Sequence, residues 1–283
     1  MSDTVRTLRL RFRRAALAGA VVALAGLAGP AACQSPGRAG QPVDDGPPTA
    51  AEPFRGSPAS SWADGADGIT LPQAQAVNGL PASHVDAALR KVKAFLVAAN
   101  LDPGVLRGGS ALPAVLLIDS TDGVRADAQS WLDRPDAERR NPLWLFTRFD
   151  PAESRLLGPV KTRGTTTVEA GDDPGVVRIR AVYTFVYPVA DAVPGRNRAT
   201  RAVVRRDLTF EVYDAGRYET DPGSVSPVAY AYWLGNHDCG AFDGVVHPWF
   251  GGEGITPGRG ADPYDLGREV ADLPRDCAPV SRV

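Results

Sequence analysis

Residues 176–189 read VVRIRAVYTFVYPV, and residues 199–214 read ATRAVVRRDLTFEVYD. In both stretches apolar and polar side chains alternate at every second position, which is the period of a β-strand with one buried face. A short segment that contains Pro and Gly separates the two stretches, as expected for neighbouring antiparallel strands. This pair of long strands decides the fold class.

Two further stretches extend the pattern. Residues 160–170 alternate and repeat Thr, and residues 228–234 are apolar and include Tyr230, Tyr232 and Trp233. Long consecutive strands without helices between them predict an antiparallel meander with one buried face. The inward positions predicted from the alternation form either the lining of an apolar pocket or a packed core, and we name Ile179, Tyr183, Phe185, Leu208 and Phe210.

Helical signals precede these strands. Ser83 is a good N-cap, and the apolar residues from Val85 to Leu96 recur at helical spacing until Asn100 and the following Asp-Pro-Gly end the helix. Shorter helices are expected at 103–107, 113–118 and 122–133. We therefore predict an α+β domain over residues 68–235, with N-terminal helices packed on a curved, cone-like antiparallel sheet.

The order of these elements resembles a known fold family. One long helix, short helices and then a curved antiparallel sheet resemble the nuclear-transport-factor-2-like (SnoaL-like) cone fold across residues 80–235. The segment ALRKVKAFLVAANLDPGVLRGG at residues 88–109 is similar to the opening helix and turn of that family. The resemblance rests on element order and implies no particular activity.

The N-terminus has the three parts of a secretory signal. Five Arg residues between Arg6 and Arg14 precede an uncharged apolar stretch at 15–29, and small residues lead to Cys33. We predict a cleaved signal peptide over residues 1–32, with export by the general or the twin-arginine route left open.

Cys33 directly follows two Ala residues at the end of the apolar stretch. This arrangement resembles the lipobox of bacterial lipoproteins, although Pro30 stands where Leu is usual. The resemblance implies a diacylglyceryl group on the Cys33 thiol; the alternative is ordinary signal-peptidase cleavage that leaves a free Cys. The whole chain also resembles the uncharacterised actinobacterial secreted lipoproteins, which implies anchoring to the outer face of the cell membrane.

Two regions flank the predicted domain. Residues 33–67 are rich in Pro, Gly, Ala, Ser and Asp, and we expect the lipidated Cys to be followed by a disordered tether that spans roughly 30 Å. Residues 236–283 read as an irregular extension. Cys239 and Cys277 remain as an even pair in an exported protein, which predicts a disulfide worth about 4 kcal/mol in the chain-entropy model.

Composition and motifs narrow the function. The first 32 residues hold five Arg and one Asp, so the net charge of −2 becomes −6 after their removal, which disfavours nucleic acid as a partner. Phosphate-loop and serine-nucleophile motifs are absent. The GNHD at 235–238 resembles one block of the calcineurin-type phosphoesterases, but the other blocks are missing. His237, Asp238, Asp243 and His247 form either a metal site or, as we expect, a solvated loop.

These observations predict a membrane-anchored extracytoplasmic lipoprotein that acts as a non-enzymatic binding or scaffold domain. Its expected partners are the membrane, through the lipid, and a hydrophobic ligand or an envelope protein. We predict no catalytic residue, metal or cofactor. The alternative is a small-molecule enzyme that uses the cone-shaped pocket, but the inward positions lack an obvious acid–base pair.

Overall fold

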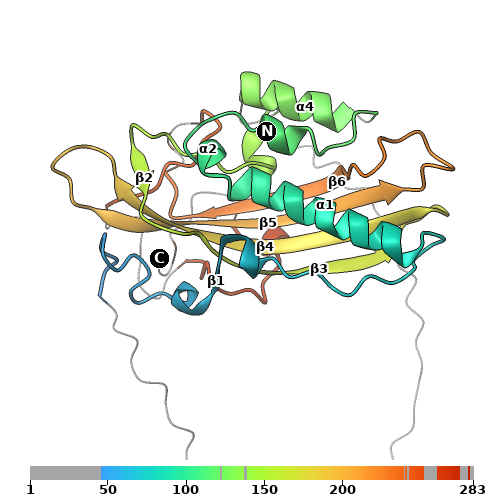
Figure 1. Cartoon of the computed structure of the whole chain (residues 1–283). Coiled ribbons are helices and arrows are strands. Elements are labelled where there is room, and N and C mark those ends of the chain that lie inside the picture. Colours follow the sequence, from blue (N-terminus) through green and yellow to red (C-terminus); the bar gives the residue numbers. More distant parts are fainter. Residues whose placement is uncertain are drawn as a thin grey trace, which may run out of the picture. The chain divides into compact units, whose positions relative to one another are not determined.

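A six-stranded antiparallel sheet forms the centre of an α+β fold (Figure 1). The computed structural model describes residues 46–121, 123–136, 139–238, 240, 242–251, 260–274 and 280. These residues all belong to one compact unit, Pro42–Val283. The predicted signal peptide, Cys33, Cys239 and Cys277 lie outside the described residues.

The four long strands follow one another in the sheet in chain order. The order is β1-β3-β4-β5-β6, and β2 pairs with the end of β4. Ile179 of β4 lies opposite Phe210 of β5, and Phe185 lies opposite Val204. The predicted α+β class and the antiparallel sheet are therefore confirmed. The strands are β1 (Ala63–Asp64), β2 (Ser154–Leu156), β3 (Lys161–Ala170), β4 (Val176–Asp191), β5 (Ala199–Tyr213) and β6 (Ser226–Gly235).

One long helix and several short ones complete the fold. The long helix begins one residue before the predicted N-cap Ser83, because the extended Pro81 accepts hydrogen bonds from the backbone N–H groups of His84 and Val85 and serves as N-cap itself. The α-helices are α1 (Ala82–Asn100), α2 (Pro103–Leu106), α3 (Leu112–Val115) and α4 (Gly123–Asp133), and the 3₁₀ helices are η1 (Pro58–Ser61), η2 (Gly65–Gly68), η3 (Pro142–Trp144) and η5 (Val270–Asp272).

The α-helices cover one face of the sheet, where the main hydrophobic core lies (Figure 1). Apolar residues of α1 such as Leu89, Val92 and Phe95 are fully buried there. Phe95 meets Phe210 of β5 edge to face, with 5.4 Å between the ring centroids. Burial of these side chains is the main favourable contribution to this layer.

The opposite face of the sheet is partly covered by the N-terminal segment, residues 46–68. Trp62 and Ala59 are buried against Val186 and Val203 of the sheet, and Lys161 pairs with Asp64 at 2.8 Å. The prediction that residues 33–67 form a disordered tether is therefore wrong for residues 46–67. The N-terminal segment needs few apolar side chains of its own to stay packed, because the sheet offers it an apolar strip to pack against.

The C-terminal segment, residues 260–274, covers another part of the same face. Val270 and Leu273 are buried against Trp233 of β6, whose Nε1 donates to the Pro274 carbonyl at 3.1 Å. Trp233 thus lies on the face opposite Tyr230 and Tyr232, which pack towards the main core. The described part of the predicted irregular extension therefore contributes a second small core.

Candidate functional site

The five residues predicted to line a pocket or fill a core are all buried in the main core. Ile179, Phe185, Leu208 and Phe210 have no exposed surface, and Tyr183 is 1% exposed. The Tyr183 hydroxyl group lies 2.8 Å from Thr166 Oγ1 and donates to the Thr70 carbonyl at 3.1 Å. These side chains are therefore held by packing and by internal hydrogen bonds.

Arg206 shares their face of β5, and the sequence analysis missed it. It follows Val204 and precedes Leu208 at the two-residue period, and it is only 1% exposed. Its guanidinium group donates to the carbonyls of Leu143 (2.7 Å) and Trp144 (3.0 Å), to Thr147 Oγ1 (2.9 Å) and to Asn100 Oδ1. The two-residue alternation of β5 already places Arg206 on the inward face. It was missed because only apolar residues were considered for that face.

All these acceptors are neutral. Burial lowers the pKa of Arg206 to about 10, so the guanidinium group still carries its charge at neutral pH. The Tyr187 hydroxyl group donates to the Asn100 carbonyl at 3.0 Å, and burial raises the pKa of Tyr187. The cluster therefore holds a fixed positive charge between helices and sheet and offers no group that gains or loses a proton near neutral pH.

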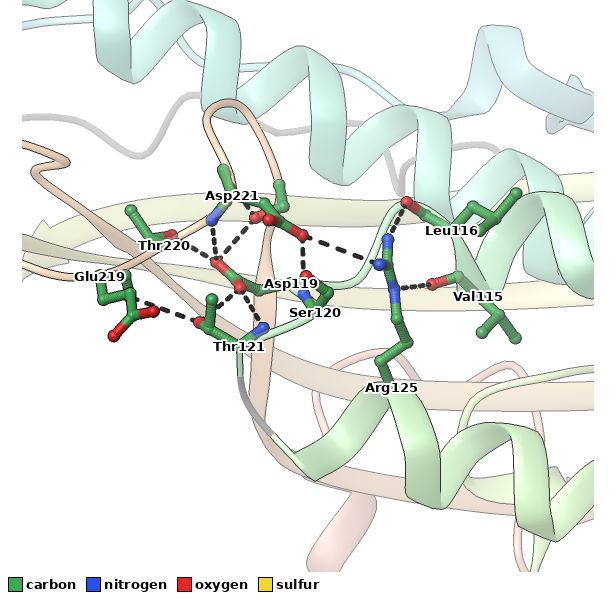
Figure 2. A network of polar contacts seen from close by, with 10 residues as sticks. Val115, Leu116, Asp119, Ser120, Thr121, Arg125, Glu219, Thr220 and Asp221 are labelled. Carbon is green, nitrogen blue, oxygen red and sulfur yellow. Dashed lines mark hydrogen bonds and ion pairs between the residues drawn. The ribbon is translucent and has the colours of Figure 1, made fainter.

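Asp119 is the centre of a second polar cluster, between α3 and α4 (Figure 2). Its Oδ1 accepts from the backbone N–H of Thr121 at 2.8 Å and from the Thr121 hydroxyl at 2.6 Å. Its Oδ2 accepts from the hydroxyls of Thr220 and Ser224 and from the backbone N–H of Asp221. Both carboxylate oxygens are therefore fully engaged.

The Asp119 cluster joins two loops that are about a hundred residues apart in the chain. Asp221 in turn accepts from the backbone N–H of Ser120 at 2.9 Å and lies 3.7 Å from the Arg125 guanidinium group (Figure 2). Burial alone would raise the pKa of Asp119, but the hydrogen bonds from Thr121, Thr220 and Ser224 lower it to about 2. A carboxylate with so low a pKa is a poor general base, so this cluster fixes the two loops.

A third cluster surrounds His247, whose side chain is 14% exposed. Its Nδ1 lies 2.6 Å from Glu153 Oε2, and its Nε2 lies 2.9 Å from Asp243 Oδ1. Burial lowers the pKa of His247, but the two carboxylates outweigh burial and raise it. When the imidazole is protonated, both of its ring nitrogens donate, one to each carboxylate, so the two acidic side chains favour the charged form.

His237 lies beside His247, with 6.0 Å between the ring centroids. Its Nδ1 accepts a hydrogen bond from the backbone N–H of His247 at 3.0 Å. Burial and the nearby His247 lower the pKa of His237 to about 4, so it is neutral at pH 7. The sequence pattern placed both histidines and Asp243 in one loop, but it gave no sign of Glu153, which is distant in the chain.

Neither a metal site nor a membrane span is found in the described residues. No group of three or more His, Cys, Asp or Glu side chains among them is arranged to hold a metal ion. No helix in the same part of the chain is both long enough and apolar enough to cross a membrane.

Comparison with known proteins gives no relative from which a function could be inferred, so the function is argued from the geometry of the clusters described above. No protein-family model matches the chain, and neither the curated proteins nor the solved structures contain a match.

Proposed function

We propose that the protein is an extracytoplasmic lipoprotein, anchored through Cys33 to the outer face of the cell membrane, that acts as a non-enzymatic binding or scaffold domain. The observation that carries the non-enzymatic part is the composition of the inward sheet face. Apolar and aromatic side chains are buried there around one charged residue, Arg206, whose hydrogen bonds go to neutral groups of the protein. Binding surfaces need no group that titrates near working pH, whereas acid–base catalysis does.

The proposal includes the finer architecture expected from the sequence. In this proposal the protein has a cleaved signal peptide over residues 1–32, a cone-like domain of the nuclear-transport-factor-2-like kind and a Cys239–Cys277 disulfide. The partners that we propose are the membrane, through the lipid, and a hydrophobic ligand or an envelope protein. The mature net charge of −6 supports attachment through a lipid, because an acidic protein gains little from anionic headgroups.

The packed N-terminal segment shortens the proposed connection to the membrane. Only about 12 residues, 34–45, separate Cys33 from Gly46, where the described chain begins. Were a segment of that length a flexible coil, it would span roughly 20 Å on average. A domain anchored in this way would work close to the membrane surface and would meet partners that lie there.

Mass spectrometry of the mature protein, isolated from its own membrane, tests the anchor. We expect the chain to begin at a diacylglyceryl-modified Cys33, and Cys33→Ala to release the protein into the medium. Cys239→Ala is the matched control, because it removes a thiol but leaves the proposed anchor in place. An unmodified mature chain that begins at another residue would refute the anchor.

A further inference from the structure

Within the part of the chain that the structure describes, the outer side of strand β6 is open along most of its length. β6 ends the strand order of the sheet, and the described backbone bonds on its outer side involve Val225, directly before the strand. Val225 accepts from the Asp119 N–H at 3.0 Å and donates to the Leu117 carbonyl at 3.2 Å. Among the described residues, no further backbone hydrogen bond reaches this side of Ser226–Gly235. Such an edge can accept another strand.

Beyond Pro227 and the β-bulge at its start, the side chains of β6 do not protect this edge. Residues 228–234 read VAYAYWL and contain no charge, and Val228 is 46% exposed. Ala229 is also exposed, and the residues from Tyr230 to Tyr232 are half-buried. The other edge of the sheet, at β3, differs. β1 covers part of β3, and the exposed, charged Arg163 and Glu169 lie among the threonines of β3. Soluble proteins usually protect a free edge with charge, proline or a covering element.

The pairing of β6 with β5 defines which side chains share a face. Tyr230 lies opposite Leu208 and Tyr232 opposite Arg206, both on the helix-covered face. Ala231 lies opposite Asp207, and Trp233 opposite Arg205, on the other face. A strand that joins β6 would continue both faces with the same alternation.

We propose that two copies of this chain pair antiparallel through β6, about a two-fold axis at Ala231. In this register Tyr230 lies opposite the partner's Tyr232; Val228, the extra residue of the bulge between Pro227 and Ala229, lies beyond the regular alternation. On the other face the small Ala229 lies opposite the partner's large Trp233, and the two Ala231 residues face each other. Every pair is uncharged, the two tyrosines meet each other, and the small Ala229 leaves room for the large Trp233, so the segment can pair with itself.

The self-complementarity favours a second copy over an unrelated peptide as the occupant. A two-fold axis uses the same seven residues twice and needs no other sequence. One strand pair forms a small interface, below the roughly 1,200 Å² that stable complexes bury. The pairing is therefore weak and depends on concentration, and attachment of both copies to one membrane would strengthen it.

Sedimentation velocity tests the pairing on the exported chain with Cys33→Ala, so that no lipid drives association. We expect the dimer fraction to increase with concentration. Ala231→Lys and Ala231→Glu each place like charges opposite one another and weaken the dimer at least tenfold, and an equimolar mixture of the two restores it. Asp207, the β5 neighbour of Ala231, is already bound to Arg180. Thr167→Lys, on the exposed face of β3, adds the same charge and leaves the dimer intact.

Amide hydrogen exchange on the unmutated strand gives an independent measurement. Dilution should speed exchange in residues 228–234 and leave residues 162–169 of β3 unchanged. A chain that stays monomeric over the whole concentration range refutes the pairing. A dimer that survives Ala231→Lys, a Lys and Glu mixture that stays monomeric, or a dimer without β6 protection also refutes it. If Ala231→Lys fails to fold, the exchange measurement decides.

Discussion

Arg205 and Arg206 are neighbours in β5, yet their guanidinium groups bind parts of the chain that lie on opposite faces of the sheet. Arg206 donates to the carbonyls of Leu143 and Trp144 on the helix side. Arg205 donates to the carbonyls of Asp265 (2.7 Å) and Arg268 (2.6 Å) in the C-terminal segment. Because successive side chains of a strand point to opposite faces, two adjacent arginines bind the helix side and the C-terminal segment, respectively.

Arg206→Met should lower the free energy of unfolding by about 2–4 kcal/mol. The substitution leaves the Leu143 and Trp144 carbonyls without their Arg206 donor, and each lost partner of a buried polar group costs about 1–3 kcal/mol. Relief from burying the charge offsets part of this loss. Urea unfolding measures the change, and Arg196→Met, at an exposed side chain, should stay within about 0.5 kcal/mol. Equal effects of the two variants would contradict the role of Arg206.

Phe210→Asp should unfold the domain, whereas Thr209→Asp should be tolerated. Phe210 is fully buried against Phe95, so the new carboxylate would lose its hydration without gaining a partner. Thr209 lies on the other face, where its cross-strand neighbour is Arg180. Circular dichroism and the unfolding midpoint measure both. A folded Phe210→Asp variant that loses a hydrolase or isomerase activity would instead identify this face as an active site.

Asp119→Asn should destabilise the protein at neutral pH and remove part of its acid sensitivity. The folded-state pKa of about 2 lies below the ordinary value near 4, so the carboxylate stabilises the fold above pH 4. That contribution, about 2 kcal/mol, is lost as the pH falls from 4 to 2. Unfolding curves at several pH values measure it, with Asp67→Asn at an exposed position as the control. An unchanged pH profile in Asp119→Asn would contradict the assignment.

The two histidines should make the loop around them sensitive to pH in opposite directions. The raised pKa of His247 gives stability that is present below about pH 6.5 and is lost as the pH rises through the folded-state value. The lowered pKa of His237, about 4, costs stability as the pH falls from about 6.5 towards 4. Hydrogen exchange in residues 242–251 measures both effects. His247→Gln should abolish the alkaline loss and keep the acid loss; the reverse pattern would overturn these roles.

The periodic elements were predictable from the sequence, because burial on one face imposes a period that side-chain chemistry displays. All four long strands were placed within about two residues of their ends in the structure. Ile179 and Phe210 were assigned to the inward face for the same reason, and they are buried there. Whether Cys33 is lipidated or left as a free Cys depends on features that the alternation does not encode.

The features that the sequence did not predict have physical causes. Arg206 was passed over because its charge contradicts an apolar pattern, although its position in the alternation matches Val204 and Leu208. The N-terminal segment was predicted to be disordered because it has few large apolar side chains, whereas Trp62 and Ala59 are enough to pack it against the sheet. Asp119 belongs to an Asp-Ser-Thr sequence that favours local turns, but its partners Thr220 and Ser224 come from a distant loop.

If the protein is anchored through Cys33 as proposed, the attachment of the N-terminal segment to the sheet has a mechanical consequence. Tension applied through Cys33 would first load the bonds from Arg201 to the carbonyls of Pro53 and Arg55, both 2.9 Å, and then the short β1–β3 pair. Release of residues 46–67 would expose Trp62 and leave the four long strands in place. At about 3.4 Å per extended residue, it would lengthen the reach from the membrane by roughly 75 Å. The segment would thus act as an extensible coupling that yields before the sheet does.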